Sequence, residues 1–185
     1  ATSDLRTQAR LFDVTGAPLG PAFEVTSDTT VSSHIPSIAS TPGGGFIVTW
    51  LRVDPPEAAI LARAFDAAGV ALGPDFLVAS GVDPSFSAPI VAVDTAGDFM
   101  ITWELAHEIL ASRFESDGTP QGGVTRLNRY TFFRPHHPRV AAGAAGRFLV
   151  VWDDQDDQIA SAVVAQRFAP DCGDGVLNPA GAWDD

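Results

Sequence analysis

A motif that recurs three times with the same internal spacing dominates this sequence. Each copy begins with a proline and reaches a tryptophan fourteen residues later, with a phenylalanine four residues before that tryptophan. The copies occupy residues 36–50, 89–103 and 138–152. A repeat at intervals of roughly 50 residues indicates an array of similar units, because each unit buries its faces only against its neighbours.

A second motif, an arginine closely followed by a phenylalanine, alternates with the first. It occurs at residues 10–12, 63–65, 113–114 and 167–168. After the first three copies, two glycines four residues apart lead into a short apolar run. Each unit thus has four runs bounded by Gly, Pro, Asp or Ser, as is typical of short strands joined by turns. We name them A (proline run), B (phenylalanine-to-tryptophan run), C (arginine run) and D (last apolar run).

This pattern predicts an all-β fold of β-propeller-like blades, with about three four-stranded repeats of roughly 50 residues over residues 1–169. A β-sandwich would not need the same aromatic residues at the same places in successive hairpins, and a β-helix has shorter coils. Alternation along run B places apolar side chains on both of its faces, which favours burial between neighbouring blades. The recurring aromatic residues are predicted to form the core: Phe46, Trp50, Phe65, Phe99, Trp103, Phe114, Phe148, Trp152 and Phe168.

The order of the runs leaves a blade incomplete at each end of the chain. The sequence supplies C-D, then A-B-C-D twice, then A-B-C. Residues 5–26 could pair with residues 138–168 and leave one C strand redundant, or separate chains could complete each other's blades. We therefore expect self-association, as an oligomer or a fibre, and a monomer at micromolar concentration would contradict it.

Charge and hydropathy exclude two classes of partner. Eleven basic residues against 23 acidic ones give a net charge of -12, which repels nucleic acids and anionic membrane surfaces. No apolar run approaches the roughly 18 residues of a membrane helix, so we expect no insertion into a bilayer. The single cysteine, Cys172, cannot form a disulfide within the chain.

The repeat resembles a family of secreted bacterial repeat proteins with the pattern R-F-D-x-x-G-x-x-x-G-x-x-F-x-V, then P-x-V-A and G-x-F-V-V-x-W. The resemblance covers about residues 8–168. It implies a repeat scaffold and export, and it supplies no catalytic residue.

The tail, residues 170–185, carries a second resemblance. The run from Cys172 to Pro179 and the final acidic pair look like the C-G-D-G-x-x-x-P-x-E-x-C-D-D repeat of myxobacterial and related exoproteins. Trp183 stands where that repeat has its second cysteine, so the implied disulfide is absent or Cys172 pairs outside this chain. Both resemblances imply a secreted protein, located extracellularly or at the cell surface.

Four carboxylates follow the last repeat tryptophan closely and form a candidate calcium site. They are Asp153, Asp154, Asp156 and Asp157, in the expected B-C loop. Carboxylate oxygens are the ligands that Ca²⁺ prefers, but the spacing is not that of an EF-hand, and a solvated acidic loop explains the run equally. We expect no other cofactor.

A candidate binding surface lies where the sequence departs from the repeat. Tyr130, Phe132 and Phe133 are exposed aromatic candidates for contact with a glycan or protein ligand, with His136 and His137 beside them. Adjacent histidines on a strand point to opposite faces, so they would share one metal ion only if the chain bends there.

No Ser-His-Asp, Cys-His or paired-carboxylate arrangement can be assigned from spacing. The sequence therefore favours a non-catalytic structural or adhesive protein, outside or on the cell surface, that self-assembles by blade completion, and no enzyme. A lectin-like module that binds carbohydrate or protein through the blade loops is the alternative, and a secreted enzyme is the third interpretation.

Overall fold

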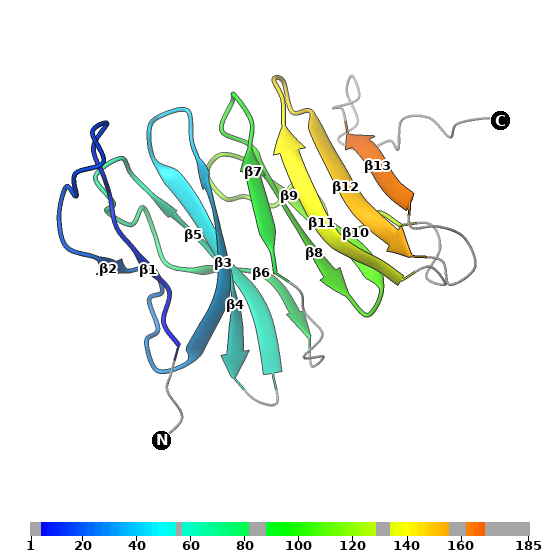
Figure 1. Cartoon of the computed structure of the whole chain (residues 1–185), viewed down its shortest axis with the longest axis horizontal. Coiled ribbons are helices and arrows are strands. Elements are labelled where there is room, and N and C mark those ends of the chain that lie inside the picture. Colours follow the sequence, from blue (N-terminus) through cyan, green and yellow to red (C-terminus); the bar gives the residue numbers. More distant parts are fainter. Residues whose placement is uncertain (1–4, 55–56, 82–87, 129–133, 156–161, 169–185) are drawn as a thin grey trace.

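The computed structural model describes residues 5–54, 57–81, 88–128, 134–155 and 162–168. Within these ranges the regular structure consists of thirteen β-strands, and no helix is present. The strands form four antiparallel sheets that lie side by side in a row (Figure 1). The described part of the chain accordingly has no helix of the length and hydropathy that crossing a bilayer requires.

The strands follow the A-to-D order of the sequence units. The first sheet pairs β1 (Gln8–Ala9) with β2 (Phe23–Glu24). The second consists of β3 (Ser32–Ser40), β4 (Phe46–Asp54), β5 (Glu57–Phe65) and β6 (Phe76–Gly81). The third contains β7 (Ile90–Val93), β8 (Phe99–Leu105), β9 (Glu108–Phe114) and β10 (Thr125–Arg126). The last contains β11 (Arg134–Ala142), β12 (Phe148–Gln155) and β13 (Ala162–Phe168). The all-β, propeller-like fold is thereby confirmed.

The A strands of successive blades are neighbours, which gives all the blades the same orientation. Strand β7 packs against both β3 and β11. The B strands β4, β8 and β12 consequently finish on the same side of the row, at the lower edge of Figure 1. We call this side, where B strands finish and β3 and β11 begin, the B–C end. Residues that follow the repeat tryptophans all lie there.

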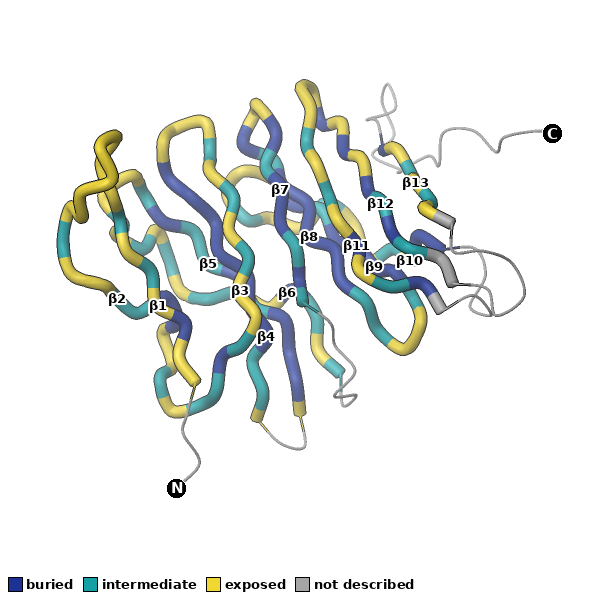
Figure 2. The backbone as a smooth tube through the Cα atoms, in the orientation of Figure 1, coloured by how far each residue is buried: buried dark blue, intermediate teal, exposed yellow. Residues whose placement is uncertain are grey.

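Aromatic pairs from strands B and C form the centre of the second and third blades, and a D-strand phenylalanine of the preceding blade covers each pair. Phe99 and Phe114 stack with ring centroids 4.9 Å apart, and Phe76 of β6 lies 6.2 and 5.6 Å from them. The same arrangement one blade earlier uses Phe46, Phe65 and Phe23. All nine aromatic residues assigned to the core are buried, and buried residues run through the second, third and fourth sheets (Figure 2).

Arg63 shows why strand C carries an arginine. Its Nε donates to the carbonyl of Gly73 at 2.9 Å, and Nη1 donates to the carbonyl of Val25 in the preceding blade at 3.0 Å. The guanidinium also forms an ion pair with Asp75 at 3.5 Å. A planar, forked cation can make these contacts at once, whereas a lysine ammonium is a single point charge.

The two ends of the row do not pair with each other among the described residues. Strands β1 and β2 form a sheet of their own, and the last sheet contains only β11, β12 and β13. The two sheets lie at opposite ends of the molecule in Figure 1. Of the two alternatives for the chain ends, the pairing of residues 5–26 with residues 138–168 is therefore wrong for this part of the chain, because two whole blades lie between the partners.

Candidate functional site

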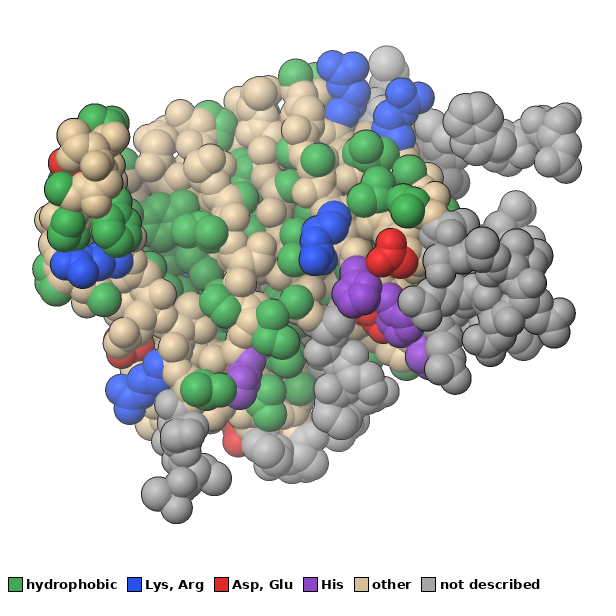
Figure 3. Space-filling model, viewed as in Figure 1, with side chains coloured by type: hydrophobic (Ala, Val, Ile, Leu, Met, Phe, Trp, Pro, Cys, Tyr) green, Lys and Arg blue, Asp and Glu red, His purple; other side chains and the backbone are tan. Residues whose placement is uncertain are grey.

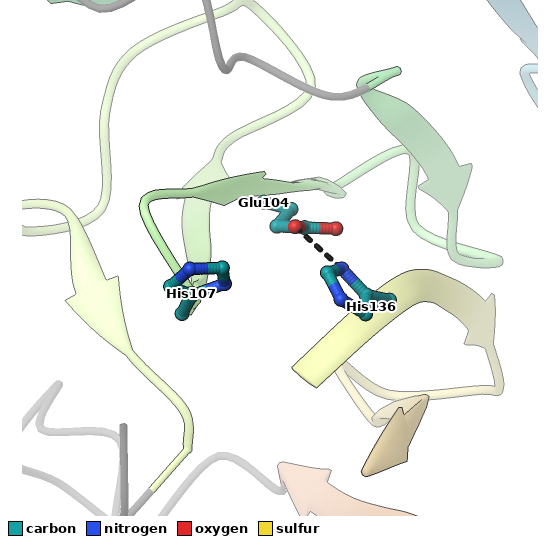
Figure 4. Close-up of side chains that lie close together, drawn as sticks. All are labelled: Glu104, His107 and His136. Carbon is teal, nitrogen blue, oxygen red and sulfur yellow. Dashed lines mark hydrogen bonds and ion pairs between the residues drawn. The ribbon is translucent and has the colours of Figure 1, made fainter. Parts of the chain in front are cut away.

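A carboxylate and two imidazoles meet at the B–C end of the third and fourth blades. Glu104, His107 and His136 each offer one ligand atom, and these atoms all lie within 4.8 Å of one another (Figure 4). Glu104 and His107 belong to the β8–β9 hairpin, and His136 comes from β11 of the next sheet. Figure 3 shows histidine side chains gathered beside acidic ones on this face.

Glu104 follows Trp103 directly and is held by the end of strand β8. The indole of Trp103 is fully buried, so the next side chain emerges at the rim of the sheet. Oε1 of Glu104 lies 2.8 Å from Nδ1 of His136, and the Glu104 side chain is 13% exposed. One proton must lie on this hydrogen bond, on the carboxyl oxygen or on the imidazole nitrogen.

His107 occupies a tight two-residue turn between β8 and β9. Ala106 and His107 both have positive φ, 50° and 67°, as a type I′ turn requires, although such turns favour Asn and Gly. The buried Asn128 holds the turn: its Nδ2 donates to the carbonyl of His107 at 3.1 Å, and its Oδ1 accepts from the N–H of Ile109 at 2.8 Å. The turn places the His107 ring 6.0 Å from that of His136.

A bulge in β11 positions His136 and His137. His136 pairs with Asp153, and the next pair is Arg139 with Val151, so two residues oppose Trp152. His137 has a φ of 54° at this bulge, and its Nδ1 lies 3.2 Å from Oδ2 of Asp153. The chain therefore bends at the two adjacent histidines, which is the condition for both to bind one metal ion. Only His136, however, belongs to the group of converging ligand atoms.

Glu104 and Asp153 occupy equivalent positions on neighbouring blades. Each follows a repeat tryptophan, Trp103 or Trp152, whereas the first copy has Leu51 at this position. Each carboxylate contacts one of the two adjacent histidines. The equivalent positions of Glu104 and Asp153 in the repeat are the sequence signal for this pair. Glu104 is isolated from other acidic residues in the sequence, so a pattern of acidic runs does not include it.

A small hollow with a mixed polar and apolar lining lies at the same end of the first two blades. It has a volume of about 200 Å³. Asp75, one of its walls, accepts hydrogen bonds from the N–H and the hydroxyl of Ser27 at 2.9 and 2.8 Å. The hydroxyl of Thr30 lowers the pKa of Asp28, with a smaller contribution from the guanidinium of Arg52. The hollow is lined by Thr26, Ser27, Asp28, Val31, Ser33, Trp50, Arg52, Leu61 and Asp75.

The candidate calcium ligands do not lie in a loop as far as the structure describes them. Strand β12 continues to Gln155, so Asp153 and Asp154 are strand residues. The expectation of a loop directly after Trp152 is wrong, because pairing with β11 and β13 extends the strand. Asp156 and Asp157 lie outside the described residues, as do Tyr130, Phe132, Phe133 and the tail 170–185. Calcium binding and the aromatic contact surface stay predictions.

Comparison with known proteins gives a likeness of fold. The structure is similar to that of an endo-arabinase from Bacteroides thetaiotaomicron, with a TM-score of 0.51 and 14% identity, over 91% of this chain and 76% of that one. A glycosyl hydrolase from Bacteroides ovatus matches with a TM-score of 0.44 and 13% identity, over 82% of this chain and 50% of that one, so the chain spans half of its length. No family model and no curated protein matches the sequence.

The interpretation of the chain as a non-catalytic structural or adhesive protein, and as no enzyme, is contradicted by the first comparison. That interpretation depended on the repeat scaffold, and the same scaffold is the fold of an endo-arabinase. The repeated core residues determine how the blades pack. Catalysis depends instead on side chains at the ends of the strands, and these differ from blade to blade. A repeat pattern alone therefore gives no reason to exclude catalysis.

Proposed function

We propose that this chain is a carbohydrate-processing enzyme that cleaves glycosidic bonds at the B–C end of its third and fourth blades. One observation carries the proposal: Glu104 and Asp153 occupy equivalent positions on neighbouring blades, and each is hydrogen-bonded to one of two adjacent histidines. The likeness of the fold to an endo-arabinase supports a glycan as substrate. This support is an analogy of fold, and the chemistry is argued from the side chains.

Glycoside hydrolysis needs two carboxyl groups with different roles. One donates a proton to the leaving oxygen, and the other takes a proton from water or attacks the sugar. Glu104 is the proton donor in this proposal, because it is the more enclosed and shares a proton with His136. Asp153, whose side chain is 49% exposed, has access to water and activates it. Water then adds to the sugar carbon as the glycosidic bond breaks, and the proton taken by Asp153 returns to Glu104 through solvent.

The hollow of the first two blades gives the substrate a second place to bind. Hydroxyl, carboxylate and guanidinium groups line it, and these are the partners that sugar hydroxyls need. Its volume is below the ~300–1,000 Å³ of pockets for drug-sized ligands, which suits a single sugar ring. Because the chain carries a net charge of -12, the preferred polymer is neutral rather than acidic. A polysaccharide substrate is also consistent with secretion, which we propose on the resemblance to exported proteins.

The test is the release of reducing ends from a panel of polysaccharides. We expect cleavage of a neutral polymer such as arabinan and none of polygalacturonate. Glu104→Gln and Asp153→Asn should each lower the rate by at least about 100-fold, since general acid–base catalysis contributes ~100–10,000-fold. Glu108→Gln is the matched control, because Glu108 lies on the same hairpin and pairs with Arg126 at 3.0 Å instead.

Two results would contradict the proposal. Absence of cleavage across the panel, by a folded protein, would mean that the fold is used without hydrolysis, and retention on a glycan array in that case would indicate a binding module. Full activity of the Glu104→Gln variant would show that the carboxylates lie elsewhere.

A further inference from the structure

We infer that Glu104, His107 and His136 form a binding site for a divalent transition cation such as Zn²⁺. Two imidazoles and one carboxylate are a donor set that zinc accepts, with a fourth position left for water. The three ligand atoms lie within 4.8 Å of one another and come from two sheets. A bound ion would therefore join the third and fourth blades.

Only small movements of the three side chains are needed for them to coordinate one ion. Zinc binds His and carboxylate ligands at ~2.0–2.2 Å in a tetrahedron, so the ligand atoms must lie about 3.4 Å apart. The oxygen of Glu104 and the nitrogen of His136 lie 2.8 Å apart, so this pair must separate by only about 0.6 Å. His107 is exposed, so rotation of its side chain can supply the rest of the movement. A cation can enter from the same side.

Features of the backbone hold the ligand residues close together before an ion binds. The His107 turn holds two residues other than glycine at positive φ, and Asn128 clamps it with two hydrogen bonds. The bulge at His137 turns the neighbouring His136 toward the hairpin. Unfavourable backbone angles persist where the surrounding structure enforces them, and here they converge on one group of ligands. A preorganised site loses less conformational entropy on binding.

The donor atoms determine which cations bind. Calcium and magnesium prefer oxygen ligands, whereas imidazole nitrogen suits zinc, copper and nickel. The net charge of -12 raises the local concentration of any cation. The site thus differs from the calcium site expected around Asp153–Asp157, because its two imidazoles favour zinc whereas a group of carboxylates favours calcium.

Metal binding also regulates the activity proposed above, and this consequence depends on that proposal. A cation bound to Glu104 occupies the oxygen that would carry the proton to the leaving group. Zinc should therefore inhibit cleavage, and a chelator should restore it. The binding itself depends on the geometry alone and needs no activity.

The experiment is calorimetric titration of the whole chain with Zn²⁺, Ni²⁺ and Ca²⁺, with Co²⁺ visible absorption to report tetrahedral coordination. We expect saturable binding of one Zn²⁺ that Ca²⁺ does not displace. His107→Ala should weaken zinc binding at least as much as the ~10–100-fold that loss of an outer partner of a metal ligand typically costs, because His107 is itself a ligand. His34→Ala is the matched control, because His34 occupies the position of His136 in the second blade, where its partner across the strand is Leu51.

Each outcome decides the inference. Equal zinc affinity in His107→Ala and in the unaltered chain, or equal loss in His34→Ala, would overturn it. Circular dichroism of each variant excludes misfolding as the cause of a loss. Zinc binding without cleavage of any glycan would keep the metal site and reject the proposed function. Cleavage without zinc binding would reject the metal site and keep the proposed function. Cleavage by His107→Ala should resist inhibition by zinc.

Discussion

Oδ2 of Asp94 accepts a hydrogen bond from the backbone N–H of Gly146 at 2.7 Å, and this contact joins the third blade to the fourth. The same carboxylate also closes its own turn, because Oδ1 accepts from the N–H groups of Ala96 and Asp98 at 2.8 and 3.0 Å. The Asp94 side chain is buried, so these bonds are not exposed to competition from water. In the other two copies of the repeat, Thr41 and Gly143 occupy the position of Asp94 and have no carboxylate. The hydrogen bond to the next blade is therefore specific to the junction between the third and fourth blades.

Asp94→Asn should destabilise the protein by about 1–3 kcal/mol, because the amide that replaces one carboxylate oxygen cannot accept a hydrogen bond and leaves a buried donor unsatisfied. Urea denaturation measures the change in the free energy of unfolding. The control is Asp66→Asn, since Asp66 makes the same two turn bonds, to Ala68 and Val70, on a more exposed carboxylate. Equal effects of the two variants would show that the bond between blades contributes nothing.

Gly45→Ala should cost about 1–3 kcal/mol or more, because a side chain there has no room. An added Cβ would lie 2.3 Å from the carbonyl oxygen of Phe65, which belongs to the paired strand β5 and cannot move without disrupting the sheet. Gly43→Ala is the control two residues earlier, where an added Cβ meets nothing within 4 Å. Thermal unfolding of both variants checks the prediction, and a wild-type melting temperature for Gly45→Ala would contradict it.

The carboxylate of Asp13 should titrate below the ordinary range of an aspartate. The hydroxyl of Thr15 donates to it at 2.7 Å and, with the N–H groups of Ala17 and Thr15, lowers the pKa of Asp13. A lowered pKa stabilises the fold above the unfolded-state pKa, and the contribution disappears as the pH falls through the folded-state pKa. Thr15→Val should raise the pKa of Asp13, whereas Thr15→Ser should keep it low. Carboxyl NMR titration of the three proteins measures this, and identical pKa values would refute it.

Much of the fold was predictable because the repeat reports packing directly. The spacing from Pro36 to Trp50 fixes a hairpin whose second strand is buried on both faces, so three copies of it predict three blades. The closure of the array was not predictable in this way. Pairing between its ends depends on where whole blades lie in space, and no local pattern in the sequence encodes that distance.

The site was harder to predict because its parts are far apart in the chain and lack a motif. Glu104 and His136 are 32 residues apart, and they meet because strand A of one blade packs against the preceding blade. On a regular strand His137 would point away from His136. The β-bulge interrupts this alternation, and the following Pro138 is the sequence feature that indicates the bulge. The position of His107 depends on a turn whose residues, Ala and His, are not those that such turns favour.

Self-association stays a prediction, and the incomplete blades at the two ends give it a specific form. The described residues supply three strands to the last sheet, with β13 beside β12, and two strands to the first sheet. An incomplete sheet offers backbone groups to a strand of another chain, so a second copy would pair at these ends, head to tail. Light scattering across a concentration series should show a mass that rises above that of one chain.

A charge at the edge should prevent this pairing. Val163 of β13 is 75% exposed, and lysine there is a common means of protecting an edge strand. Val163→Lys should therefore shift the mass toward a single chain. Leu149→Lys is the control, because Leu149 is exposed on β12, which already has a strand on each side. If the unaltered chain has the mass of a monomer at every concentration, head-to-tail pairing of these ends is refuted.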